Sequence, residues 1–297
     1  MSSDARTNGP QQGRSYKLWN VPFKEVLMKK RFIGLLMAFT LANSLMLAGC
    51  GAHTGSPSED GDHLTRIQNS GKIVIAMEGQ WAPWTYHDES GDLVGFDTEV
   101  GKAIADKLGV KAEFIEGEWD GLFAGLDGGR YDCIINGVEI TEERTEKYDF
   151  TTPYAYIKTA LVVADDNTDI TSFENLSGKK TSNSLGSTYA DLAEQFGASV
   201  SNVDTLSETI DMVLSGRVDA TLNAEVSFYD YLGEHPDAPI KIVDLTDDAS
   251  EVSIPLVKGE DNATLREAVN KAIDELRADG TLKSLSEKYF GSDITGK

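Results

Sequence analysis

The chain has 297 residues, and its 27 lysines and arginines stand against 49 aspartates and glutamates, which gives a formal net charge of −22 at pH 7. Such an acidic surface is repelled by nucleic acid and by anionic lipid, so neither is an expected partner. With two cysteines and four histidines scattered along the chain, neither a disulfide framework nor a Cys/His metal centre is expected, and no cofactor is indicated.

The first 49 residues have the pattern of a secretion signal and are expected to be removed. A short cationic segment starts at Met28, the expected start of translation, and precedes an apolar run over residues 32–48. This run is shorter than the roughly 20 residues that a spanning helix needs. The following "LAGC" resembles a bacterial lipobox, which implies cleavage before Cys50, acylation of its thiol and anchoring to the cell membrane. Residues 50–63 are polar and bear Gly, Ser and Pro, so they are expected to be a tether.

From residue 64 onward, short strand-like runs alternate with helical patterns. Val100, Ile104 and Leu108 recur on one face of an expected helix that ends at Gly109. Cys133 lies in an apolar run and is expected to be a small buried side chain without a catalytic role. The expected order is strand "KIVIAM", helix "FDTEVGKAIADKLG", strand "KAEFIEG", short helix "WDGLFAGLDGG" and strand "YDCIING".

The same rhythm restarts at Leu161 and predicts a second α/β unit. The expected order is strand "ALVVAD", short helix "SFENLSGKK", strand "KTSNSL", helices "STYADLAEQFG" and "TLSETIDMVLSG", and strand "VDATLNA". A strand "EVSIPLVK" and two C-terminal helices follow, the first with Leu265, Val269 and Ile273 on one face. This alternation predicts an α/β fold with parallel sheets covered by helices on both faces. Two such units suggest two lobes, with a ligand cleft at the carboxyl ends of the strands.

Seven segments carry a resemblance to a known family. They are "GKIVIAMEGQWAPWTY", "GDLVGFDTEVGKAIADKLGV", "WDGLFAGL", "YDCIINGVEITEERTEKYDFTTPY", "LSGKK", "GRVDATLN" and "ELRADGTLKSLSEKYFG". In this order they resemble the solute-binding proteins of polar amino-acid ABC importers, the bacterial family 3 solute-binding proteins, with the cystine-binding branch closest in look. The resemblance implies a two-lobed, type II periplasmic-binding-protein-like fold whose chain crosses the hinge twice. Lobe one would comprise residues 64–156 and 250–297, and lobe two residues 157–249.

The resemblance also implies a function. The protein would be an extracytoplasmic monomer that captures a free amino acid and delivers it to an ABC permease in the membrane. It would not catalyse a reaction, and it would hold no metal.

Arg144 ends the segment "NGVEITEER", which also contains three glutamates. From spacing alone, Arg144 could be a surface side chain that pairs with Glu142 or Glu143. A guanidinium can bind both oxygens of a carboxylate at once, which a lysine cannot. The resemblance implies this second role, with Arg144 bound to the carboxylate of an amino acid.

The remaining contacts of the amino acid are implied by the resemblance residue by residue. Trp81 would stack on the ligand side chain, Glu78 would lie near its far end, and Trp119 would form the opposite hydrophobic wall. In lobe two, a loop and helix start would offer N–H groups to the carboxylate, since helix N-termini favour anions. Ser187 or Thr188 could also serve as the helix cap. The further positions are Asn136 and Gly137 at a strand end, and Ser184, Gly186, Ser187, Thr188 and Tyr189 in that loop and helix start.

The partner of the ligand ammonium departs from the family pattern. The family usually has an aspartate just after "GRxDAxxx", where this chain has Ala224, and a serine or threonine where this chain has Glu139. We expect Glu139 to bind the ammonium, since a buried carboxylate without a partner is costly. Glu225 is the alternative, although a strand neighbour of Ala224 should point away from the position of Ala224.

The motifs leave the ligand open between two classes. "MEGQWAPW" together with "NGVEITEERTEKYDFTTPY" favours cystine, whereas Glu78 and Glu139 in one cleft would also suit arginine or lysine. A dehydratase-like enzyme on the same scaffold is the alternative of another class, with Glu139 as its acid. A sensor ectodomain would be expected to continue into a membrane-spanning or kinase segment beyond Lys297.

Overall fold

The computed structural model describes residues 61–296. The expected signal segment (1–49), the acylated Cys50 and the tether up to residue 60 lie outside the described residues. Within residues 61–296, no helix is long and apolar enough to cross a bilayer.

The first described element is a helix that the sequence analysis did not predict, α1 (His63–Ser70). Asp62 caps it by accepting a hydrogen bond from the backbone N–H of Thr65 at 2.9 Å. Ile67 is its buried residue, so "HLTRIQNS" shows little apolar periodicity. The helix contacts α8 (Ala263–Ala278), and its first residue, His63, is the last residue of the expected tether.

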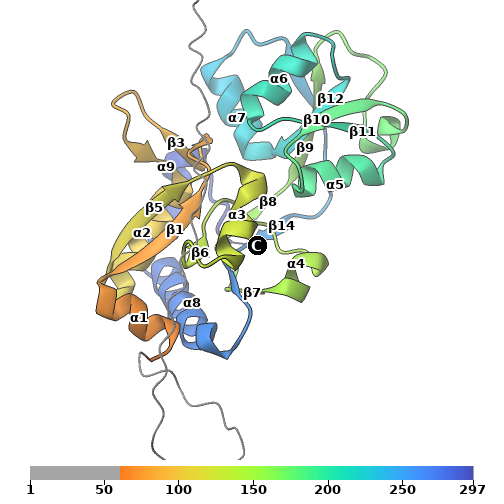
Figure 1. Cartoon of the computed structure of the whole chain (residues 1–297). Helices are drawn as coiled ribbons and strands as arrows, with labels where there is room; N and C mark the ends of the chain where they lie inside the picture. Colours follow the sequence, from red (N-terminus) through yellow and green to blue (C-terminus); the bar gives the residue numbers. More distant parts are fainter. Residues whose placement is uncertain (1–60, 297) are drawn as a thin grey trace, which may run out of the picture. The chain divides into compact units, whose positions relative to one another are not determined.

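Lobe one is built on a three-stranded parallel sheet in the order β5-β1-β6 (Figure 1). Its strands are β1 (Lys72–Met77), β5 (Lys111–Glu116) and β6 (Cys133–Ile134). Successive side chains of β1 point to opposite faces. Ile73 and Ile75 pack in one hydrophobic cluster with residues of α2 (Phe96–Leu108) and α8. Ala76 belongs to a second cluster with residues of α3 (Trp119–Asp127), so both faces are covered, as expected for a parallel sheet.

Shorter elements complete lobe one. They are β2 (Gln80–Trp81), β3 (Thr85–His87), β4 (Leu93–Val94), α4 (Glu142–Lys147), β7 (Tyr148–Phe150), β15 (Pro255–Val257), the 3₁₀ helix η2 (Glu260–Asn262) and α9 (Thr281–Phe290). Helix α9 contacts both α2 and α8. Helix α4 was not predicted, because "EERTEK" buries no residue and so has no apolar periodicity. Thr141 fixes its start by accepting a hydrogen bond from the backbone N–H of Arg144 at 3.2 Å.

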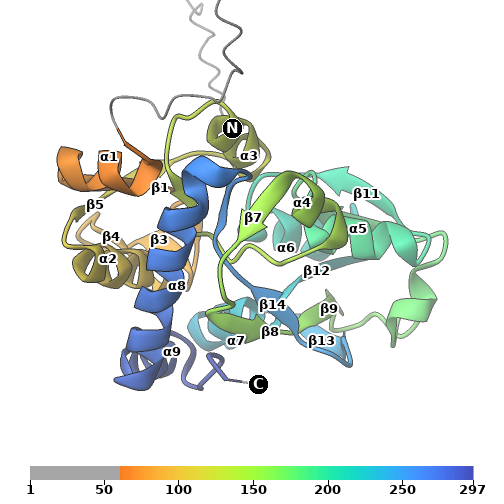
Figure 2. The same ribbon diagram turned by 90° about the horizontal axis from the view of Figure 1, so that it is seen from below.

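Lobe two is built on a five-stranded sheet in the order β11-β10-β12-β9-β13. Figure 2 labels β11, β12, β9 and β13 of this sheet. Its strands are β9 (Thr159–Ala164), β10 (Lys180–Asn183), β11 (Ser199–Asn202), β12 (Ala220–Ala224) and β13 (Ile240–Leu245). The prediction of a purely parallel sheet is wrong here, because β9 runs antiparallel to both β12 and β13. The run "TALVVA" is buried on both faces whichever way it runs, so its hydrophobic pattern does not indicate its direction.

The helices of lobe two are the 3₁₀ helix η1 (Phe173–Leu176), α5 (Thr188–Gln195), α6 (Leu206–Leu214) and α7 (Glu225–Glu234). Helices α5 and α6 both contact β10 and β12. Along the chain, α5 starts shortly after the end of β10, and α6 shortly after the end of β11. The sequence analysis predicted α5 and α6 but not α7.

Two strands connect the lobes, β8 (Ala155–Ile157) and β14 (Ser250–Val252), and they pair antiparallel. The segment "EVSIPLVK", expected as one strand, is instead split into β14 and β15, which pair with β8 and β7 respectively. At the break, Thr151 Oγ1 accepts a hydrogen bond from the N–H of Ile254 at 3.1 Å, and Ser253 Oγ donates to the carbonyl of Thr151 at 2.7 Å. The N–H of Thr151 also donates to the carbonyl of Ile254 at 3.1 Å, so side-chain and backbone bonds together hold the break, which an apolar pattern cannot reveal.

Candidate functional site

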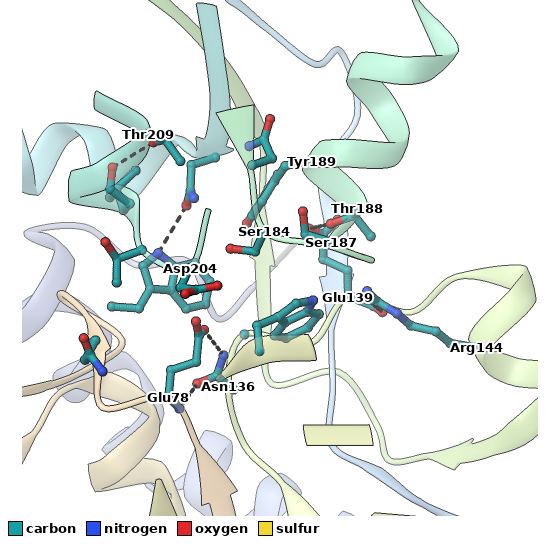
Figure 3. A pocket seen from close by; sticks show the side chains of 18 residues that line it. Glu78, Asn136, Glu139, Arg144, Ser184, Ser187, Thr188, Tyr189, Asp204 and Thr209 are labelled. Atoms are coloured by element: carbon teal, nitrogen blue, oxygen red, sulfur yellow. Dashed lines mark hydrogen bonds between the residues drawn. The ribbon is translucent and has the colours of Figure 1, made fainter. Parts of the chain in front are cut away.

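A cavity lies between the carboxyl ends of strands from the two lobes (Figure 3). It encloses about 550 Å³ of space free of protein atoms, part of it open to solvent. Lobe one lines it with Glu78, Gln80, Trp81, Trp119, Asn136, Gly137, Glu139 and Arg144, and lobe two with Asn183, Ser184, Ser187, Thr188, Tyr189, Asp204, Thr205, Leu206, Thr209 and Asn223. Every residue expected in the site is among them except Gly186 and Glu225.

Glu78 and Asn136 form the floor of the cavity in lobe one, where the neighbouring strands β1 and β6 end. The N–H of Glu78 donates to Asn136 Oδ1 at 2.8 Å, and Asn136 Nδ2 donates to Glu78 Oε2 at 2.6 Å. Burial raises the pKa of Glu78 to about 7; the hydrogen bond from Asn136 opposes this rise, and the charge of Glu118 adds to it. Near neutral pH, Glu78 can therefore hold or release a proton in response to a ligand.

The turn at Gly137 is held from beneath by Asp97, a fully buried residue in the first turn of α2. Asp97 Oδ2 accepts a hydrogen bond from the N–H of Gly137 at 2.6 Å, and its Oδ1 accepts one from the hydroxyl of Tyr154 at 2.8 Å. Burial raises the pKa of Asp97 to about 7, although both hydrogen bonds favour the charged form. These bonds fix the end of β6 beneath the cavity.

Two stacked tryptophans join the lobes beside this turn. The rings of Trp81 and Trp84 lie 5.2 Å apart at an angle of 17°. Trp81 Nε1 donates to Asn223 Oδ1, and Trp84 Nε1 donates to Ser227 Oγ, each at 3.2 Å. Both acceptors belong to lobe two, so these two bonds exist only while the lobes are together.

Arg144 lies at one end of the cavity and reaches both lobes. Its Nη1 donates to the carbonyl of Glu139 at 2.9 Å, and its Nη2 donates to the carbonyl of Gly186 at 3.2 Å. Its guanidinium carbon is 5.3 Å from the ring centre of Trp119 and 5.4 Å from that of Phe123, within cation–π range. Burial lowers the pKa of Arg144 while the charge of Glu139 opposes the shift, and the side chain stays charged.

Arg144 does not form the surface ion pair with Glu142 or Glu143 that its spacing in the sequence allowed. Glu143 instead pairs with Lys147, at 3.0 Å between Nζ and Oε1. The arginine is therefore directed into the cavity by α4, with its charge facing the space that a ligand would fill.

Glu139 is the buried acid of the cavity, with 5% of its surface exposed. The hydroxyl of Thr188 donates to Glu139 Oε1 at 2.6 Å, which is a bond between the lobes. The backbone of Glu139 forms an isolated antiparallel bridge with Val252 of β14. This acid is therefore tied both to the hinge and to the start of α5.

The two expected residues outside the cavity lining have other positions. Gly186 contributes its carbonyl to Arg144 from behind the cavity. Glu225 is the first residue of α7 rather than a strand residue, and its N–H donates to the carbonyl of Lys158 at 2.9 Å. Ser187 lines the cavity and is also the cap of α5, since its Oγ accepts a hydrogen bond from the N–H of Ala190 at 3.1 Å.

Sequence reasoning missed several lining residues of lobe two, of which three carry polar groups at strand ends. Asn183 ends β10, Asp204 follows β11, and Asn223 lies near the end of β12. The rule that ligands bind at the carboxyl ends of strands would have pointed to all three positions. The other missed residues are Gln80, Thr205, Leu206 and Thr209.

The described residues offer little for metal or thiol chemistry. No group of three or more His, Cys, Asp or Glu side chains within residues 61–296 is arranged to hold a metal ion. Cys133 is buried in β6, as predicted, and burial raises the pKa of its thiol well above the usual range, which disfavours a reactive thiolate.

Two α/β lobes joined by a pair of strands, with a small-molecule cavity between them, define the class of two-lobed solute-binding proteins. Residues 73–292 match the model of the bacterial extracellular solute-binding proteins, family 3, and the chain belongs to this family.

Individual relatives show the extent of the similarity. The L-cystine-binding protein TcyA of Bacillus subtilis is 36% identical over 273 residues, which cover 90% of this chain and 100% of that protein. The structure of an ancestral arginine-binding protein bound to arginine is 40% identical, covers 74% of this chain and 99% of its own, and has a TM-score of 0.70. The L-cystine solute receptor of Neisseria gonorrhoeae, in an unliganded open conformation, is also 40% identical, with coverages of 80% and 100% and a TM-score of 0.55.

These comparisons define the general role of the protein. It is the amino-acid-binding component of an ABC importer and works outside the cytoplasm. The predictions of the family, of the two-lobed α/β fold and of a non-enzymatic role are confirmed.

The contact between Gly137 and Trp81 leads to a testable prediction. Gly137 has φ 56°, and a Cβ added to it would lie 2.6 Å from Trp81 Cζ3. Gly129 has a similar φ of 65°, but a Cβ there would meet nothing within 4 Å. Gly137→Ala should therefore lower the free energy of unfolding by about 1–3 kcal/mol more than Gly129→Ala, measured by urea denaturation. Equal losses would show that the indole moves aside without cost.

Proposed function

We propose that the cavity captures a free α-amino acid by its two charged groups, with the carboxylate at Arg144 and the ammonium at Glu139. The observation that carries this proposal is that a cation and an anion line the same cavity and each also bonds to lobe two. A zwitterion needs opposite charges close together, and a site between two lobes can supply them when it closes.

The environment of Arg144 suits a carboxylate. Its guanidinium has five N–H donors, and its bonds to Glu139 and Gly186 leave others available. A charged carboxylate is a stronger acceptor than a backbone carbonyl, so it could replace the bond to Gly186. The rings of Trp119 and Phe123 hold the guanidinium in place, and the start of α5 adds a partial positive charge nearby.

The environment of Glu139 suits an ammonium. A carboxylate this buried is costly unless it is paired, and Thr188 bonds to Oε1, which leaves Oε2 for a ligand donor. Glu225 does not line the cavity, which favours Glu139 for this role.

For the ligand itself we propose cystine, with arginine or lysine as the alternative. A cystine-binding protein is 36% identical over nearly the whole chain, and a cystine receptor is 40% identical. An arginine-bound relative is also 40% identical, so sequence identity does not rank the two ligands. Both classes carry a second positive group beyond the α-ammonium, which the acidic lining would accommodate.

Binding would act on an equilibrium between open and closed lobes. At the same 40% identity, the structure has a higher TM-score with the arginine-bound relative than with the open, unliganded one. The bonds of Trp81 and Trp84 across the lobes support the same assignment to a closed form. A ligand that contacts both lobes would stabilise this form, which is the one offered to the permease.

We further propose that the protein is held at the membrane by lipid on Cys50. The support is the "LAGC" segment after a cationic and apolar leader. A polar tether after the anchor would leave the lobes free to close while they remain near the permease.

The first prediction of this proposal concerns the ligand. Thermal-shift measurements on residues 51–297, without reducing agent, should show stabilisation by cystine, since a ligand that binds only the folded form raises the melting temperature. At a ligand concentration 100 times the Kd, the rise should be roughly 5–10 °C. A rise with arginine or lysine but not cystine would move the assignment to the cationic class, and no rise with any amino acid would refute the proposal.

The role of Glu139 can be tested by removing its charge. Glu139→Gln keeps an oxygen for the Thr188 hydroxyl but loses the anion, so affinity for the ligand should fall at least ~10-fold, about 1.4 kcal/mol. Glu225→Gln, measured by the same calorimetric titration, should leave the affinity unchanged. The opposite pattern would transfer the role to Glu225.

The lipid anchor has a separate test. Cys50→Ser should shift the protein from the membrane fraction to the soluble fraction of cells without changing its affinity for the ligand, because the thiol is the only proposed attachment point. Cys133→Ala serves as the control and should stay with the membrane. Retention of the Cys50→Ser protein in the membrane pellet would contradict lipidation at this residue.

A further inference from the structure

The part of the cavity away from Arg144 contains hydrogen-bond acceptors that have no matching donors. Figure 3 shows Asp204 and Glu78 on the side of the pocket opposite Arg144. Glu78 comes from lobe one and Asp204 from lobe two, so their carboxylates reach the cavity from opposite sides. Among the lining residues, Arg144 is the one cation.

Asp204 has a carboxylate with no partner inside the described structure. Its backbone N–H donates to Glu208 Oε2 at 3.1 Å, but within residues 61–296 its side chain makes no hydrogen bond or ion pair. It stands directly before α6, whose start is fixed by a capping box between Thr205 and Glu208. The backbone at Asp204 is therefore anchored while its charge is left free.

A second, buried acceptor lies beside it. Asn183 is 1% exposed, and its Nδ2 donates to the carbonyl of Leu222 at 2.6 Å, whereas its Oδ1 is buried without a partner. The carbonyl of Asn183 accepts a hydrogen bond from the N–H of Val203 at 3.3 Å, which places Asn183 next to the segment that carries Asp204. A buried acceptor without a donor is costly, so a donor from a ligand would stabilise this atom.

Glu78 adds the third acceptor from lobe one. Asn136 donates to its Oε2, and Glu78 lines the cavity. Its burial favours the neutral acid, but a cation placed next to it would favour the carboxylate instead. Two carboxylates and one amide oxygen form a set that suits a group with several N–H donors and a positive charge.

We propose that Asp204 determines specificity by binding, together with Asn183 and Glu78, a cationic group at the far end of the ligand. The shared chemistry is a distal cation with several N–H donors, which the guanidinium of arginine, the ammonium of lysine and the second ammonium of cystine each supply. Because Asp204 belongs to lobe two and Glu78 to lobe one, the distal cation is held from both sides only when the lobes close. Recognition of the side chain is thereby coupled to closure. This inference rests on the proposed capture of an amino acid at Arg144 and Glu139.

The test compares charged ligands with neutral analogues of the same shape, by calorimetric titration of the purified protein. Arginine is paired with citrulline, in which a urea group replaces the guanidinium. Cystine is paired with the mixed disulfide of cysteine and 3-mercaptopropanamide, which lacks the second ammonium and has an uncharged amide in place of the second carboxylate. If arginine binds, the distal cation is a guanidinium, and if cystine binds, it is the second ammonium. Within the pair whose charged member binds, Asp204→Asn should weaken the charged ligand at least ~10-fold, about 1.4 kcal/mol, and the neutral analogue less than ~2-fold.

Two further variants serve as controls. Asp211→Asn makes the same change of charge on the exposed side of α6, away from the cavity, and should change neither affinity. Asp204→Glu keeps the charge and should recover part of the loss, and a melting curve of each variant confirms that it is folded.

The outcomes separate this inference from the proposed function. If Asp204→Asn weakens both members of the pair equally, or neither, the distal role of Asp204 is wrong while amino-acid capture stands. If the unmodified protein binds the neutral analogue as tightly as the charged ligand, the distal cation site is also wrong. If the unmodified protein binds none of the four compounds and no other amino acid, both proposals fail.

Discussion

The chain passes between the lobes twice, through β8 and through β14. Because these two strands pair antiparallel, they form a single connection, and the geometry of the site depends on it. The parallel strands β1, β5 and β6 of lobe one and β10, β11 and β12 of lobe two end at the side that faces the other lobe, so polar groups at those ends meet only when the connection lets the lobes approach. The bonds from Trp81 to Asn223 and from Thr188 to Glu139 are of this kind. The isolated bridge between Glu139 and Val252 ties the acid of the cavity directly to the connecting strand.

The cavity is lined by charged side chains whose burial within one lobe alone would cost considerable free energy. Asp97 is satisfied entirely within lobe one, by Tyr154 and Gly137, and therefore acts as a support rather than a contact for ligand. Glu139 and Arg144, in contrast, are satisfied in part by lobe two. Groups whose partners lie in another lobe can exchange those partners for a ligand, whereas a fully internal pair cannot do so without disrupting its own lobe.

Local pattern was sufficient for much of the fold, because strands such as β1 and helices such as α2 and α8 bury continuous apolar faces. It was not sufficient where long-range pairing decides the outcome, as in the direction of β9 and the break between β14 and β15. Helix α4 has no apolar face to detect. The site residues Glu139 and Arg144 lie in a short segment with a family pattern, but Asn183, Asp204 and Asn223 are brought together only by the order of strands in the sheet of lobe two. No local run of sequence determines that order of strands.

The bonds that Trp81 and Trp84 make between the lobes bear on how the cargo leaves. They join the lobes without involving Arg144 or Glu139, and neither Trp84 nor Ser227 lines the cavity, so at least the bond between these two residues holds the lobes together without a contact to the cargo. The lifetime of the bound complex then depends on two contributions, the direct bonds between the lobes and the bonds to the ligand. Separating the lobes would break the indole bonds before, or together with, the bonds to the ligand. A transporter that engages both lobes can thus discharge the receptor by separating them, without having to compete chemically for the amino acid.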